Sequence, residues 1–74
     1  MSRVEDLRIK AIASELSLNG SLADFDFEGD FHAVMAELHQ RCRDSAMGSN
    51  SGMISSFLTI NRLTNARIDY LTAG

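Results

Sequence analysis

The sequence lacks proline and contains a single cysteine, Cys42. One cysteine excludes an intrachain disulfide. Many small domains are stabilised by disulfides, because the hydrophobic core of a domain this small contributes only about 3–5 kcal/mol of stability. The chain of 74 residues is long enough for one domain. Its stability must therefore come from helix packing, a metal or a partner chain. The lone cysteine and the absence of a secretory leader indicate a reducing compartment and predict a cytoplasmic protein.

Long apolar runs and clusters of positive charge are also missing. The longest apolar stretch, residues 53–60, contains two serines and a threonine, and a membrane-spanning helix requires roughly 18 apolar residues. The net charge is −3, and the seven Lys and Arg residues are scattered. Nucleic-acid-binding proteins instead gather positive charge on one face. We therefore expect neither a membrane nor a nucleic acid as partner.

Apolar periodicity and capping residues predict three helices. Ser2 and Glu5 form a capping-box pair that begins the first helix, at about residues 3–18, and Gly20 ends it. Asp30 is the expected N-cap of a second helix at about residues 31–46. Apolar residues that recur at steps of three and four support both helices. The first helix contains Val4, Leu7, Ile9, Ala11, Ile12 and Leu16, and the second contains Phe31, Val34, Met35, Leu38 and Cys42.

Residues 48–52 have the composition of a flexible turn, and a third helix is expected at about residues 53–72. This helix is rich in Ser, Thr and Asn, which are mediocre helix formers, so packing must stabilise it. The short turn makes the second and third helices antiparallel neighbours. We therefore predict one all-α domain over residues 1–74, with three short helices of which the last two form a hairpin.

The third helix has more apolar surface than the second helix can cover. Its main apolar face, expected to be buried, contains Met53, Phe57, Ile60, Ile68 and Leu71, with Ile54 and Leu58 at the edge. Leu63 and Tyr70 lie on another flank, which we expect to stay exposed and to contact a partner. The alternative is that the first helix covers this flank.

Acidic and aromatic residues alternate in the segment 21–30. Aromatic anchors among carboxylates are typical of a binding epitope, and the acids would attract a basic partner. The alternative is that the phenylalanines fasten the second helix to the first. Including the flank of the third helix, we predict these partner-binding residues: Asp24, Phe25, Asp26, Phe27, Glu28, Leu63 and Tyr70.

The same segment resembles the first half of the calcium loop of EF-hand proteins. Asp24, Asp26 and Glu28 occupy its first three acidic positions, and Gly29 follows them as the pattern requires. The bidentate glutamate that should close the loop is replaced by Met35. The missing ligand favours an acidic approach to the second helix over a calcium site.

Other candidate chemistry is weaker. His32, His39 and Cys42 come from a single segment, whereas zinc sites usually draw four ligands from two segments. A Cys–His nucleophile also needs an orienting group and an oxyanion pocket. The third helix carries only Arg62 and Arg67 as bases, which is poor for reading DNA. We expect no enzymatic activity, no metal and no cofactor.

These observations favour a small non-enzymatic protein-binding module, such as an adaptor, a co-chaperone or an inhibitor, that uses exposed helical apolar surface. The partner would be another protein, a second copy of the chain, or both, and a homodimer is expected. Two alternatives stay open: a structural subunit that assembles with itself into a dimer or filament, and a degenerate calcium-binding protein.

Overall fold

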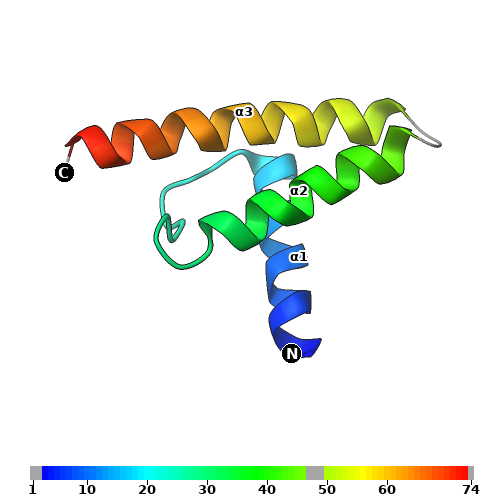
Figure 1. Ribbon diagram of the computed structural model, residues 1–74, viewed down its shortest axis with the longest axis horizontal. Coiled ribbons are helices and arrows are strands. Elements are labelled where there is room, and N and C mark those ends of the chain that lie inside the picture. Colours follow the sequence, from blue (N-terminus) through cyan, green and yellow to red (C-terminus); the bar gives the residue numbers. More distant parts are fainter. Residues whose placement is uncertain (1–2, 47–49, 74) are drawn as a thin grey trace.

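Three helices make up most of the described chain: α1 spans Arg3–Asn19, α2 spans Phe31–Ala46 and α3 spans Asn50–Ala73 (Figure 1). The structure is a computed structural model that describes residues 3–46 and 50–73, and side-chain surroundings for residues 3–44 and 54–73. Within these ranges there is no strand. The predicted all-α class is confirmed. Ser2, half of the expected capping box, lies outside the described residues.

The start of α3 differs from the prediction. The helix begins at Asn50 and runs through Gly52, so the expected turn over residues 48–52 is wrong in its second half. A single glycine inside a helix costs only about 1 kcal/mol relative to alanine. Packing of the long helix on its neighbour can offset that cost, which composition alone does not reveal.

The last two helices form the predicted antiparallel hairpin. In Figure 1, α2 and α3 lie side by side and run in opposite directions, and most interhelix contacts join this pair. The first helix crosses the pair steeply, and its first two turns project away from the core. Val4 and Leu7 in its N-terminal half are therefore exposed, although the apolar stripe of the sequence placed them with the core.

The core lies where the C-terminal half of α1 meets the middle of the hairpin. The apolar stripe predicted for α2 is the one that is buried, because Phe31, Val34 and Leu38 face inward and Met35 and Cys42 pack at its edge. Among the residues whose side-chain surroundings are described, eight apolar residues from all three helices are buried: Ile9, Ala13, Leu16, Phe31, Val34, Leu38, Ile60 and Leu63.

Gly20 ends α1 as predicted, and the structure adds a second reason for glycine there. Its φ of +70° lies in the left-handed region, and its N–H donates to the carbonyl of Leu16 at 3.0 Å. The guanidinium of Arg62 donates to the Gly20 carbonyl oxygen, and a Cβ at position 20 would collide with that guanidinium. The close approach joins the end of α1 to α3.

Two arginines join α1 to α2. Arg8 donates from both terminal nitrogens to the Asp30 carboxylate, at 3.1 and 2.7 Å, and also pairs with Glu5 at 2.7 Å. Arg41 donates to the carbonyl of Lys10 and to the hydroxyl of Ser14, both at 3.0 Å. The hydrogen bonds from Arg8 hold the pKa of the Asp30 carboxyl below its usual range. Asp30 directly precedes α2 as predicted, and its side chain binds α1.

Replacing Leu63 by alanine should lower the free energy of unfolding by about 2–5 kcal/mol, because its side chain is fully buried and its truncation leaves a cavity. The matched control is Leu18→Ala, since Leu18 is 83% exposed and its loss should change stability by no more than about 0.5 kcal/mol. Urea unfolding followed by circular dichroism measures both. Equal effects of the two substitutions would contradict the buried position of Leu63.

Arg8→Ala should lower the melting temperature at pH 7, and the difference from the parent protein should shrink as the pH falls below about 4. The pKa of Asp30 is depressed by Arg8, so this stabilisation is present above the ordinary carboxyl pKa and is lost as the pH falls through the lower folded-state value. Thermal scans from pH 3 to pH 7 check this. In an Asp30→Asn background, Arg8→Ala should lose most of its pH dependence; an unchanged dependence would show that Asp30 is not the responsible group.

Candidate functional site

One face of α3 presents large apolar side chains to solvent. Ile54, Phe57, Leu58, Ile68 and Leu71 are each 56–62% exposed. They recur at helical steps of three and four with exposed polar residues between them, and we call the whole set the open face of α3: Ile54, Phe57, Leu58, Asn61, Thr64, Asn65, Ile68, Leu71 and Thr72. From Ile54 to Leu71 the face is about 26 Å long at 1.5 Å per residue.

The opposite face of α3 packs against the other helices, and it contains small polar residues as well as leucine. Ser56 and Thr59 are buried together with Leu63. The Thr59 hydroxyl donates to the carbonyl of Ser55 at 2.9 Å and lies 3.3 Å from the hydroxyl of Ser17 on α1. Because these hydroxyls have partners, burying them carries little penalty.

The structure therefore corrects two expectations about α3. The face expected to be core is largely exposed, and only Ile60 of its described members is buried. Leu63, expected on an open flank as a partner-binding residue, is fully buried. Tyr70 shares the side of Leu63 and is 44% exposed. The periodicity placed these residues correctly relative to one another, but it did not determine which side turns inward.

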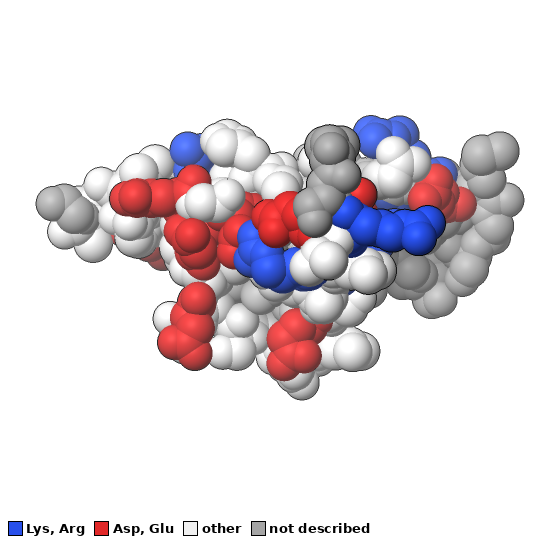
Figure 2. Space-filling model, turned by 90° about the horizontal axis from the view of Figure 1, so that it is seen from below, with Lys and Arg blue, Asp and Glu red and all other residues white. Residues whose placement is uncertain are grey.

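The open face carries no charged residue, although the chain as a whole is acidic. In all of α3 only Arg62, Arg67 and Asp69 are charged, and they lie beside the open face rather than on it. Charged side chains are instead spread over the side from which α1 projects (Figure 2). The residues of the open face can therefore offer apolar contact and shape, and no charge of their own.

The aromatic residues of the segment 21–30 pack against α3. Phe25 and Phe27 are half-buried and meet edge to face, with centroids 5.0 Å apart and planes at 84°. Phe27 in turn stacks on Tyr70, with centroids 5.2 Å apart and planes at 21°. The sequence left open whether the phenylalanines form an epitope or hold the second helix against the first. In the structure, Phe27 contacts the third helix through Tyr70.

Two polar contacts reinforce this fastening. The Tyr70 hydroxyl donates to Oε1 of Glu28 at 2.9 Å. The bond and the negative charge of Glu28 raise the pKa of the Tyr70 phenol. The guanidinium of Arg67 lies 4.5 Å from the centroid of the Phe31 ring, in cation–π geometry. The C-terminal half of α3 is thus held on its buried side by residues that precede or begin α2.

Asp26 fixes the turn that leads into α2. Its Oδ1 accepts the N–H of Glu28 at 3.1 Å and of Gly29 at 2.8 Å, and its carbonyl accepts the N–H of Asp30 at 3.0 Å. This is an Asx turn, in which the side chain replaces a backbone acceptor. Among the residues that the structure describes, no three His, Cys, Asp or Glu side chains are placed to hold a metal ion.

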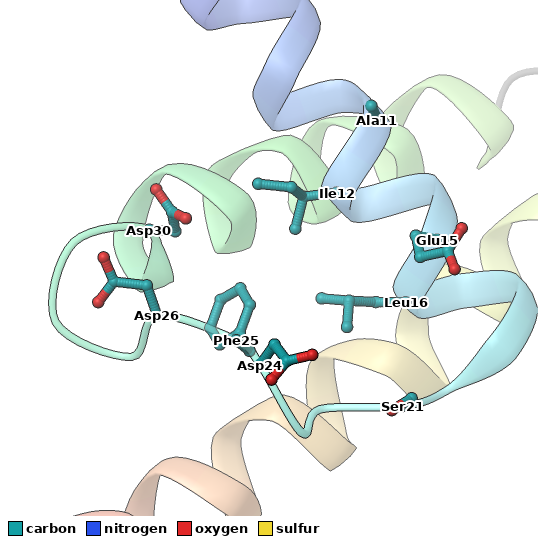
Figure 3. Close-up of a pocket in the computed structure, with 9 residues that line it drawn as sticks. All are labelled: Ala11, Ile12, Glu15, Leu16, Ser21, Asp24, Phe25, Asp26 and Asp30. Atoms are coloured by element: carbon teal, nitrogen blue, oxygen red, sulfur yellow. The ribbon is translucent and has the colours of Figure 1, made fainter.

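A shallow hollow of about 480 Å³ lies between the C-terminal half of α1 and the acidic segment (Figure 3). Ile12, Leu16 and Phe25 contribute its apolar lining. Glu15, Asp24, Asp26 and Asp30 lie around it. Two of these acids are already engaged, Asp26 by backbone donors and Asp30 by Arg8. The hollow therefore combines a small apolar surface with four acidic side chains, and two of these, Asp26 and Asp30, make contacts that stabilise the fold.

Comparison of the chain with protein-family models, with curated proteins and with solved structures found no significant match. Over the described residues, every helix is too short or too polar to cross a membrane. The function must therefore be argued from the geometry of the open face and of the segment that supports α3.

The phenol of Tyr70 should titrate above the ordinary tyrosine value of about 10, because Glu28 accepts its hydrogen bond. Tyr70 is the only tyrosine and the sequence has no tryptophan, so phenolate absorbance reports this group alone. Glu28→Gln should move the pKa back toward the ordinary value, and denaturant should do the same. A Tyr70 pKa that is identical in the parent and the variant would contradict the contact.

Proposed function

We propose that this chain is a small, non-enzymatic protein-binding module, of the kind that serves as an adaptor, co-chaperone or inhibitor, and that the open face of α3 is its binding surface. The supporting observation is the set of five large apolar side chains, each more than half exposed, along one uncharged face. Exposed apolar patches bordered by polar residues often mark interaction sites in soluble proteins.

The size of the open face fits this proposal. Five large side chains exposed to this degree present on the order of 100 Å² each, which gives about 300 Å² in the first apolar group, about 200 Å² in the second and about 500 Å² together. Burial of that area is worth about 12 kcal/mol before the costs of association. Those costs are about 4–15 kcal/mol, so the face can support binding only if most of it is covered.

The spacing of the apolar residues indicates the mode of binding. Anchors at steps of three, four and seven along one helix are typical of a helix that lies in a groove or against a second helix. Ile54, Phe57 and Leu58 form one group of anchors, and Ile68 and Leu71 form the other. A matching partner surface is an extended apolar strip.

The acidic and aromatic segment has a supporting role in this proposal. Phe27 and Glu28 hold Tyr70 on the buried side of α3, and Asp26 fixes the turn that places them. Phe25 and the exposed Asp24 line the hollow beside α1. Of the residues predicted to contact a partner, Asp26, Phe27, Glu28 and Tyr70 help to keep α3 and the start of α2 in place, and in this proposal the principal contact surface is the open face.

The proposal is tested by replacing Leu58 with a photo-reactive benzoylphenylalanine in the cells that produce the protein naturally. We expect discrete protein adducts on irradiation, because Leu58 lies within the open face. The matched control is the same replacement at Leu18, which is equally apolar and 83% exposed on α1. The absence of adducts at position 58, or the same set of adducts from both positions, would remove the support for this binding surface.

A further inference from the structure

Along the open face of α3, apolar residues lie at both ends and polar residues lie in the middle. Ile54, Phe57 and Leu58 form its first third, and Ile68 and Leu71 form its last third. Between them lie three exposed polar residues: Asn61, Thr64 and Asn65. An apolar–polar–apolar strip superposes on itself when it is turned end to end.

We propose that the occupant of the open face is a second copy of this chain, with the two α3 helices antiparallel about a two-fold axis at the polar centre, between residues 61 and 65. The inference rests on the proposed function, because it names the partner of the same surface. A two-fold interface requires a patch that is complementary to itself. The open face meets this requirement in both pattern and charge.

The antiparallel pairing places like residues together. With the axis near position 62.5, Ile54 faces Leu71 of the second copy, Phe57 faces Ile68 of the second copy, and Asn61 faces Thr64 of the second copy. Two apolar pairs then meet near each end of the seam, and the central amides and hydroxyls can hydrogen-bond to each other. Antiparallel helices also place the positive end of each helix dipole beside the negative end of the other.

The area agrees with what a stable dimer needs. About 500 Å² of apolar surface from each copy gives about 1,000 Å², and the polar centre adds to it, which reaches the lower bound for specific interfaces. The residues of the open face are uncharged on a chain with net charge −3, and one exposed acid of α3, Asp69, borders them. Without a disulfide, a chain of this size also gains stability by association.

Nothing on the other helices obstructs this arrangement among the described residues. The contacts that hold α3 come from its buried side: Arg62 to Gly20, Arg67 over Phe31, and Tyr70 to Glu28. In Figure 1, α1 and α2 both lie on one side of α3, and its other side is uncovered. Two copies can therefore meet through α3 with their remaining helices on the outside.

Sedimentation of the purified full chain tests the proposal. We expect a mass of twice 8.1 kDa at high concentration, with dissociation on dilution. Phe57→Glu and Ile68→Glu should each weaken self-association at least about 100-fold, because each places a charge in an apolar seam. Both sites are exposed in one copy, so circular dichroism should show an intact fold. The control Leu18→Glu should leave the dimer unchanged.

Disulfide trapping in a Cys42→Ser background tests the orientation. Ile54→Cys mixed with Leu71→Cys should form a covalent heterodimer, and Asn61→Cys alone should form a homodimer near the axis. Ile54→Cys alone should not crosslink, because the two copies of position 54 lie at opposite ends of the seam. Efficient crosslinking of Ile54→Cys with itself would show parallel helices and overturn the arrangement.

The outcomes separate this inference from the proposed function. A chain that stays monomeric at about 1 mM, or a dimer that Phe57→Glu leaves intact, overturns the second copy as occupant. If photo-adducts at position 58 then contain a different protein, binding through the open face stands. If position 58 gives no adducts and the chain is monomeric, both proposals fail.

Discussion

The structure depends on one constraint: α3 is covered from one side only. It pairs with α2, its C-terminal end extends beyond α2, and α1 crosses the pair steeply on the same side. Three helices arranged in this way cannot enclose the longest of them, as a fourth helix lying alongside would. Residues of α3 that face away from the other two helices and from the segment before α2 are therefore left in solvent. The exposed apolar side chains from Ile54 to Leu71 are the direct consequence.

The sequence was sufficient to predict where the helices lie along the chain, but it was insufficient to predict which face of α3 is buried. Gly20 and Asp30 identified the end of α1 and the start of α2, because capping chemistry is local. The stripe of α2 was recognised because it is the only apolar stripe on that helix. On α3 two faces compete, and the richer apolar face was assigned to the core. Apolar residues are, however, often found on protein surfaces, so the more apolar of two faces need not be the buried one. The face with Ser56 and Thr59 packs well because its hydroxyls are satisfied, and Leu63 supplies its apolar centre.

The segment 21–30 shows a second limit of local patterns. Alternating acids and aromatics indicated an epitope, yet its decisive contacts reach residues far along the chain, from Phe27 to Tyr70 and from Phe31 to Arg67. Such pairs cannot be identified from spacing, since nothing near Phe27 in the sequence points to Tyr70. The resemblance to a calcium loop fails for a similar reason. An acid that could be a ligand in isolation, Asp26, serves as the acceptor of an Asx turn once the chain is folded.

These long-range contacts also explain how exposed apolar surface on α3 can be specific. Arg62, Arg67 and Tyr70 all hold the helix from its buried side, so the open face is presented by an element that is already ordered. A pre-ordered helix loses little conformational freedom on association, which leaves more of the burial energy for affinity. In the dimer that we propose, the polar centre restricts the alignment, because Asn61 faces Thr64 of the second copy and loses that partner if one helix slides along the other. Buried asparagines fix register in helical assemblies by the same penalty. A strip with apolar ends and a polar middle therefore selects one alignment, which a uniformly apolar helix would not.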